Sequence, residues 1–238
     1  MTALMLKLAS YNIRKALGTD RRRSPERILE VLSEIDADII ALQEADRRFG
    51  ERAAVLPEWL LEAHTPYRAV PLDGRIESMG WHGNALLVRR EAEILTADRI
   101  HLPCLEPRGA VTVTTRTDGL TLRVVGMHLD LSGLWRRRQS TAVLHYLDQP
   151  SHHDADGTVL MGDLNEWSRD RGCLMDFSRS FSMASCGRSF HARRPIVALD
   201  RIMWRGELDL VDSGVHMSAT ARRASDHLPI WAAFKTHR

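Results

Sequence analysis

Three stretches near the start of the chain decide its fold: residues 6–13 (LKLASYNI), residues 24–35 (SPERILEVLSEI) and residues 37–43 (ADIIALQ). The first and the last are short, mainly apolar runs, which are typical of buried β-strands. The middle stretch opens with Ser24-Pro25, an N-cap residue followed by proline at the first helical position, and its apolar residues then recur at helical spacing. Together the three stretches predict a β-α-β unit.

The rest of the chain adds strands that are connected differently. Residues 110–116 and 121–128 have strand composition, and Asp118-Gly119 between them predicts a hairpin, which pairs its strands antiparallel. A helix is predicted at residues 134–147. Further strands are predicted at residues 84–90, 158–161, 197–204, 208–215 and 229–234. A mixed sheet with many strands and few helices favours an α/β sandwich, with helices packed outside two sheets, over a purely parallel sheet.

Composition narrows the class of protein. The 238 residues are 44% hydrophobic and 27% charged, which predicts one α/β domain over residues 1–238. The formal net charge of +2 is far below that of proteins that hold nucleic acid by electrostatics alone. The three cysteines lack CxxC or Cys/His spacing, which argues against disulfides and zinc and favours the cytoplasm. No run of 18 apolar residues or signal sequence occurs, so we expect an unprocessed protein without a transmembrane segment.

Polar residues stand where the predicted strands end. They are Asn12, Glu44, His128, Asp163, Asn165, Asp226 and His227. Residues at strand ends meet at one rim of a sheet, where α/β proteins commonly build their sites. Carboxylate and amide oxygens without cysteine are the ligands of a hard cation, Mg²⁺ or Mn²⁺. Glu44 is the best single candidate ligand, because a lone carboxylate ending a buried strand needs a compensating charge.

This set of residues suits phosphoryl chemistry. Such a site orients a water for in-line attack, neutralises charge on the equatorial oxygens and assists the leaving group. Asp163, Asn165, His128 and His227 have side chains able to do this. The sequence therefore predicts a metal-dependent hydrolase that cleaves a phosphate ester.

Seven motifs in order carry a resemblance to a known family. They are SYNIR (10–14), ALQE (41–44), GNALLV (83–88), MHL (127–129), GDLNEW (162–167), LDRI (199–202) and SDHLPI (225–230). This series resembles that of the endonuclease/exonuclease/phosphatase superfamily, which includes exonuclease III-type repair enzymes, pancreatic DNase and neutral sphingomyelinases. The resemblance implies a four-layered α/β sandwich with two central mixed β-sheets flanked by helices.

The resemblance also implies roles for individual residues. Glu44 would bind the divalent metal, with Asn12 and Asp226 close to it. Asp163 and Asn165 would position and activate the water and bind the phosphate. His227 would stabilise the pentacoordinate phosphate or act as the base.

Further candidates extend this set. Asp200 in LDRI resembles the family aspartate that orients the catalytic histidine. His128 resembles the proposed general acid of pancreatic DNase and the sphingomyelinases. Asn84 in GNALLV is a candidate substrate-binding residue, and the glycine-rich loop beside it, Gly80 to Gly83, could line the pocket or simply turn the chain. Arg108 could hold a phosphate oxygen through its planar guanidinium, a task that suits arginine better than lysine.

Several alternatives stay open. The natural substrate can be a nucleic acid, a phospholipid or a small phosphoester, and Trp59, Trp135 and Trp167 are candidates for recognising any of these. The arginine runs at residues 21–23, 136–138, 193–194 and 222–223 are interpreted as solvated surfaces rather than a groove for a polyanion, given the small net charge. A non-catalytic module that binds phosphate or nucleic acid in the same cleft is the second hypothesis. We expect a monomer.

Overall fold

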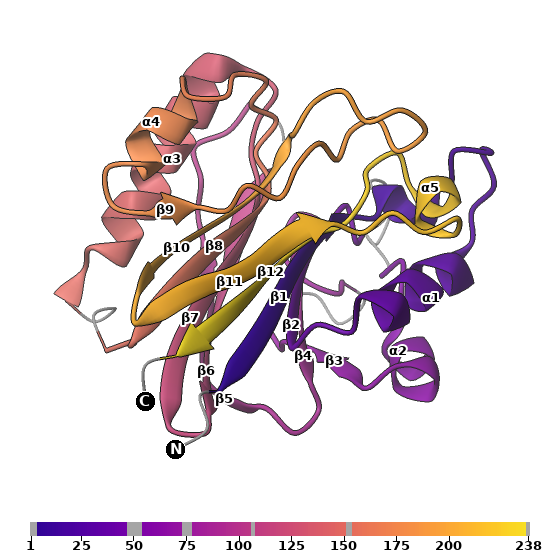
Figure 1. Ribbon diagram of the computed structural model, residues 1–238, viewed down its shortest axis with the longest axis horizontal. Coiled ribbons are helices and arrows are strands. Elements are labelled where there is room, and N and C mark those ends of the chain that lie inside the picture. Colours follow the sequence, from indigo (N-terminus) through magenta and orange to yellow (C-terminus); the bar gives the residue numbers. More distant parts are fainter. Residues whose placement is uncertain (1–3, 47–53, 73–77, 106–107, 151–153, 237–238) are drawn as a thin grey trace.

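Two six-stranded sheets form the centre of the protein (Figure 1). The computed structural model describes residues 4–46, 54–72, 78–105, 108–150 and 154–236. The first sheet has the order β11 (Leu208–Val215), β12 (Ile230–Thr236), β1 (Met5–Asn12), β2 (Ile39–Gln43), β4 (Ala85–Arg89) and β3 (Tyr67–Ala69). The second has the order β5 (Glu93–Ile100), β6 (Gly109–Thr117), β7 (Leu120–His128), β8 (Gly157–Asp163), β10 (Asp200–Gly206) and β9 (Ser182–Met183).

Helices cover the outer face of each sheet. On one side lie α1 (Pro25–Ile35), α2 (Glu58–His64) and α5 (Ala221–Ala224), and on the other lie α3 (Gly133–Leu147) and α4 (Cys173–Phe177), as Figure 1 shows. A short 3-10 helix, η1 (Arg14–Ala16), follows β1. The predicted sandwich of helices outside two mixed sheets is therefore confirmed.

Alternation along the strands explains the layers. In β1, Leu8 belongs to the apolar cluster between the two sheets, whereas Tyr11 packs with the residues of α1. In β8, Val159 and Met161 face the other sheet, whereas Leu160 packs on the side of α3 and α4. Because successive side chains of a strand point to opposite faces, a strand buried on both faces fills two layers of core.

The opening β-α-β unit and the hairpin match their predictions. Strands β1 and β2 pair in parallel across α1. Strands β6 and β7 pair antiparallel through Asp118 and Gly119, which have φ values of 47° and 83°, the left-handed pair that a type I′ turn requires. Strand β10 begins at Asp200, later than the predicted residue 197, because Val197 pairs with Phe190 in an isolated bridge instead.

The topology brings all the motifs to one end of the sandwich. In the first sheet, β1 and β2 end there, while β4 and β12, which run antiparallel to them, begin there. In the second, β7 and β8 end there, while β6 and β10 begin there. Both described chain ends lie near the opposite end (Figure 1).

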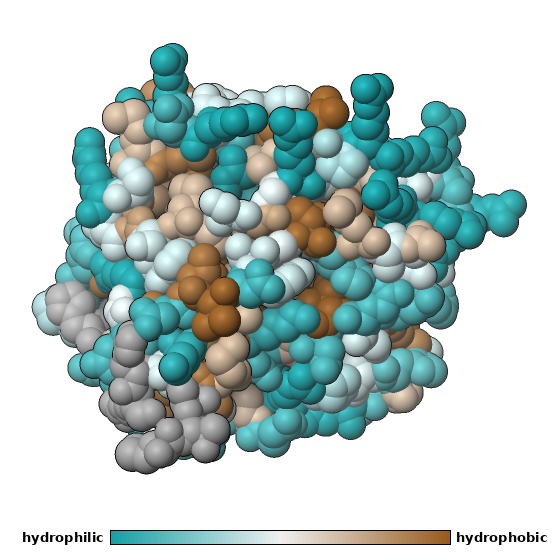
Figure 2. All heavy atoms as spheres, viewed as in Figure 1, coloured by the Kyte–Doolittle hydropathy of each residue, from teal (hydrophilic) through white to brown (hydrophobic). Residues whose placement is uncertain are grey.

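The surface is largely polar on the face shown in Figure 2, where hydrophobic side chains lie among hydrophilic ones. In the described part of the chain, no helix is long and apolar enough to cross a membrane.

Candidate active site

The second sheet aligns three of the predicted site residues in one row. His128, the last residue of β7, lies directly opposite Asp163, the last residue of β8. Asp163 in turn lies opposite Asp200, the first residue of β10. Side chains directly opposite each other across a sheet point to the same face. The register alone therefore places an imidazole and two carboxylates side by side.

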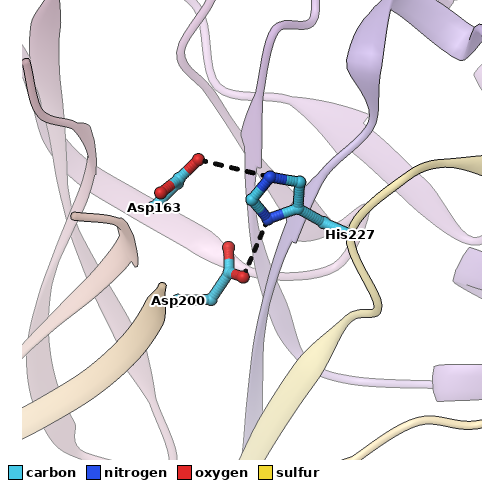
Figure 3. A group of neighbouring side chains, drawn as sticks. All are labelled: Asp163, Asp200 and His227. Atoms are coloured by element: carbon cyan, nitrogen blue, oxygen red, sulfur yellow. Dashed lines mark hydrogen bonds and ion pairs between the residues drawn. The ribbon is translucent and has the colours of Figure 1, made fainter. Parts of the chain in front are cut away.

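His227 completes this row from the segment that precedes β12. Its Nδ1 lies 2.9 Å from Oδ2 of Asp200, and its Nε2 lies 3.7 Å from Oδ2 of Asp163. Figure 3 shows the imidazole between the two carboxylates. Burial disfavours the charged ring, but the carboxylates of Asp200 and Asp163 outweigh it and raise the pKa of His227 to about 10.

Asp200 is also held by Ser189. The Ser189 hydroxyl donates to Oδ2 of Asp200, the same oxygen that faces Nδ1 of His227. Asp200 is almost fully buried and does not line the cavity described below. It therefore reaches the site only through its contact with His227, and the orienting role that the LDRI motif implied stays a prediction.

Asp163 connects the two sheets. Its Oδ2 accepts a hydrogen bond of 3.0 Å from Nδ2 of Asn12, the last residue of β1. Its Oδ1 accepts a hydrogen bond of 2.9 Å from the backbone N–H of Asn165. Asn165, at a φ of 50°, donates its Nδ2 to the carbonyl oxygen of Leu129 at 2.9 Å. The Asn12 side chain and the Asn165 backbone thus hold the Asp163 carboxylate, while Leu129 holds the Asn165 side chain.

His128 and Arg108 lie on the side of Asp163 that faces away from Asp200, because β7 and β10 pair with opposite edges of β8. The Nη1 atom of Arg108 lies 2.6 Å from Nε2 of His128, and Nε2 lies 3.4 Å from Oδ2 of Asp163. Burial, opposed by Asp163 and reinforced by Arg108, lowers the pKa of His128 to about 3. His128 is therefore a neutral imidazole at neutral pH, in contrast to His227.

These residues line one open cavity of about 310 Å³. The lining residues are Asn12, Arg14, Lys15, Leu17, Arg23, Glu44, Arg108, His128, Leu131, Asp163, Asn165, Asp226 and His227. The structure thus brings together every predicted site residue except Asp200, which lies behind His227, and Asn84.

Asn84 is outside the cavity lining, so its position does not support the prediction that it binds substrate. Its fully buried side chain donates Nδ2 to the carbonyl oxygen of Trp81 at 3.3 Å. Asn84 and Trp81 also exchange backbone hydrogen bonds. The glycine-rich loop therefore turns the chain before β4 rather than exposing an amide to the cavity.

Three cations in the lining, Arg14, Lys15 and Arg23, were not predicted as site residues, and the first two pair with predicted ones. Lys15 forms an ion pair with Glu44, and Nε of Arg14 lies 3.1 Å from Oδ2 of Asp226. Both cations stand directly after the SYNI segment, and this closeness to Asn12 in the sequence was the signal available for them. They show that each of these carboxylates attracts a positive charge.

Two groups of side chains could hold a metal ion. The ligand atoms of Asp163, Asp200 and His227 all lie within 4.8 Å of one another. However, both nitrogens of His227 face carboxylates, which suits an ion-paired imidazolium better than a metal ligand. The donor set of Asn12, Glu44 and Asp226 offers amide and carboxylate oxygens on the cavity wall, which fits Mg²⁺ or Mn²⁺.

Comparison with known proteins agrees with this geometry. The model of the Endonuclease/Exonuclease/phosphatase family matches residues 9–227. The chain belongs to this family. Members of the family are generally phosphoester hydrolases that use divalent metals.

One curated relative, a UPF0294 protein of Klebsiella pneumoniae, is 36% identical over 133 residues, covering 54% of this chain and 48% of the relative. The chain described here thus spans about half the length of that curated relative. Among solved structures, a mannosyl-6-phosphatase of Bacteroides thetaiotaomicron superposes with a TM-score of 0.76 at 18% identity, covering 96% of this chain and 99% of the other. D. rerio TDP2 complexed with a single-strand DNA product superposes with a TM-score of 0.73 at 15% identity, covering 98% of this chain and 99% of the other.

Proposed function

We propose that this chain is a divalent-metal-dependent hydrolase that cleaves a phosphate ester by in-line attack of an activated water. The observation that carries the proposal is the imidazole of His227, which is held by Asp200 at Nδ1 and faces the cavity and Asp163 through Nε2. A buried histidine fixed in this way can donate to a phosphate oxygen without first reorganising. The phosphatase and the DNA-bound protein that share this fold are consistent with phosphoester chemistry.

The residues divide the work between the two sheets. Asp163 would accept a proton from the attacking water while Asn12 and the backbone of Asn165 hold its carboxylate in place. The water oxygen forms the new bond to phosphorus, and the bond to the ester oxygen breaks on the opposite side, so that the ester oxygen leaves with the electron pair and takes a proton from solvent water. His227 would donate to the phosphate oxygens, where negative charge accumulates.

Arg108 and His128 would position the phosphate. Arg108 contributes a permanent positive charge, and the neutral His128 beside it contributes a hydrogen-bonding ring. Asn12, Glu44 and Asp226 would hold Mg²⁺ or Mn²⁺. When bound, the ion supplies Lewis-acid charge that withdraws electrons from the phosphate.

Hydrolysis of bis-p-nitrophenyl phosphate and p-nitrophenyl phosphate, with Mg²⁺, Mn²⁺ or chelator, tests the proposal. We expect His227→Asn and Asp163→Asn to lower turnover by about 100-fold or more, since each removes a group that acts in the transition state. His145→Asn is the matched control, because His145 is an exposed histidine of α3. Full activity in His227→Asn, or activity that survives chelation, would contradict the mechanism.

If the protein hydrolyses none of a wider panel of DNA, phospholipid and small phosphoester substrates, the result would favour the binding-module hypothesis instead. The cytoplasmic location, the single domain and the monomeric state remain predictions. Cell fractionation, limited proteolysis and sedimentation, respectively, would test them.

A further inference from the structure

Three arginine runs that are far apart in the sequence meet at one place on the surface. Residues 21–23, 193–194 and 222–223, here called the arginine rim, are joined through Thr19. Its backbone N–H and its hydroxyl donate to the carbonyl oxygens of Arg223 and Arg222, at 3.0 and 3.1 Å. The guanidinium of Arg193 donates to the carbonyl oxygen of Thr19.

The arginine rim continues into the cavity. Arg23 lines the cavity, and its Nη1 donates to the carbonyl oxygen of Lys15 at 2.9 Å. The backbone N–H of Ala192 donates to the carbonyl oxygen of Asp226 at 2.7 Å. The rim and the carboxylates at the cavity wall therefore belong to one packed unit.

Positive charge dominates this part of the surface. Arg21, Arg22, Arg23, Arg193, Arg194 and Arg223 are exposed. Asp20 lies among them, but its carboxylate is 2.9 Å from Arg27 and so is already compensated. In Figure 2, long hydrophilic side chains project at the upper right, over the region where α5 and the chain before α1 lie in Figure 1. A small net charge for the whole chain did not reveal this, since it does not report how charge is distributed.

An aromatic path leads away from the catalytic histidine. The ring of Phe190 lies 4.8 Å from that of His227, centroid to centroid, and Trp167 lies 6.5 Å from Phe190. Trp167 is 61% exposed and borders a second cavity, of about 520 Å³, that also contains Arg169 and Arg188. An exposed indole next to cations is a platform on which a nucleobase can stack.

We propose that the arginine rim and Trp167 bind a single-stranded nucleic acid across the active site. Its phosphates would follow the arginines, and one base would stack on Trp167, so that a phosphodiester between them lies at His227. An extended strand can reach both the arginine rim and Trp167, which lie on separate segments near His227. A single strand is favoured over a duplex, because stacking on a side chain requires a base that has left its own stack.

The cleavage part of this inference rests on the proposed hydrolase function, whereas binding does not. Binding is therefore measured in chelator, by fluorescence anisotropy of an oligothymidylate of about 20 nucleotides at NaCl concentrations of about 50 to 300 mM. The rim variant is Arg21→Ala/Arg22→Ala/Arg194→Ala. In the described part of the chain these three side chains make no ion pair that their removal would break.

A control variant, Arg138→Ala/Arg179→Ala/Lys235→Ala, removes the same charge at exposed positions elsewhere, where the described part of the chain likewise gives the three side chains no ion pair. We expect the rim variant to bind at least about tenfold more weakly at low salt, and to lower the slope of log affinity against log salt by about 2, because each phosphate contact on a single strand contributes about 0.7. The control should match the wild type. Equal losses in both variants, or a loss in neither, would overturn the proposal.

Trp167→Ala should weaken binding by about fivefold or more without changing the salt slope, because stacking releases no counterions. Trp59→Ala is its matched control, since Trp59 on α2 is 66% exposed. Vesicles containing anionic phosphatidylserine provide the competing probe. If the rim variant loses vesicle binding but retains oligothymidylate binding, the surface is a membrane site and the nucleic-acid proposal is wrong. Because no arm of the experiment requires turnover, an inactive wild type would leave this test intact.

Discussion

The charged state of His227 leads to a specific dependence of stability on pH. Its pKa is about 10 in the folded protein, against about 6.5 in an unfolded chain. Between these values the folded protein keeps a proton that the unfolded chain has released. The folded state then binds more protons, so the free energy of unfolding must fall as the pH rises.

The magnitude follows from a single proton. One proton difference changes the free energy of unfolding by about 1.4 kcal/mol per pH unit, which amounts to about 2 kcal/mol between pH values of about 7 and 8.5. His128 does not contribute in this window, because with a folded pKa of about 3 it is neutral in both states. Cys173 and Cys186, whose pKa burial raises to about 12, add to this fall as the pH approaches the unfolded thiol pKa of about 8.5, but they do so equally in the wild type and in a His227 variant.

Urea denaturation of the metal-free protein across this window measures the effect. His227→Asn should be less stable overall. The slope of its free energy of unfolding against pH should be less negative than that of the wild type, by about 1.4 kcal/mol per pH unit. His145→Asn should keep the wild-type slope, because His145 is exposed on α3. Parallel curves for the wild type and His227→Asn would refute the assignment of an ion-paired imidazolium between the two carboxylates.

Three further predictions follow from the site and its strands. Asp200→Asn should lower turnover by about 10- to 100-fold with little change in KM in steady-state kinetics, because the proposed mechanism requires the carboxylate that holds Nδ1 of His227; a wild-type turnover would contradict this role. Arg108→Ala should raise KM by about tenfold, whereas Arg116→Ala, at the far end of β6, should leave it unchanged. Gly162→Ala should lower the stability in thermal unfolding by about 2 to 4 kcal/mol, because an added Cβ would overlap the carbonyl oxygen of Met127; an unchanged Tm would show that β7 and β8 can separate there.

The ends of the buried strands were predictable from the sequence, because a short apolar run that stops at a polar residue is typical of a buried strand reaching the edge of its sheet. Asn12, His128 and Asp163 all lie at such ends, and the structure places each at the cavity. The edge strand β5 was not predicted. Its residues, EILTADRI, are mostly exposed or half-buried, so they lack the apolar signal on which strand prediction depends.

Contacts between loops could not be predicted. The pairing of Lys15 with Glu44, and the meeting of three arginine runs around Thr19, depend on how irregular segments pack against one another. No local periodicity encodes such packing. Asn84 illustrates the opposite case, since its motif and a turn beside it were both recognisable, but the burial of its side chain in that turn was not.

The hydrogen bond from Asn12 to Asp163 has a consequence for how the protein acquires activity. It joins the last residue of a strand in one sheet to the last residue of a strand in the other. Each sheet on its own holds only part of the site. Asn12 ends a strand of the first sheet and His227 precedes another, whereas the second sheet carries His128, Asp163 and Asp200. During folding, catalytic competence would therefore emerge only when the two sheets dock and bury the apolar layer between them, making the return of activity a late reporter of that docking.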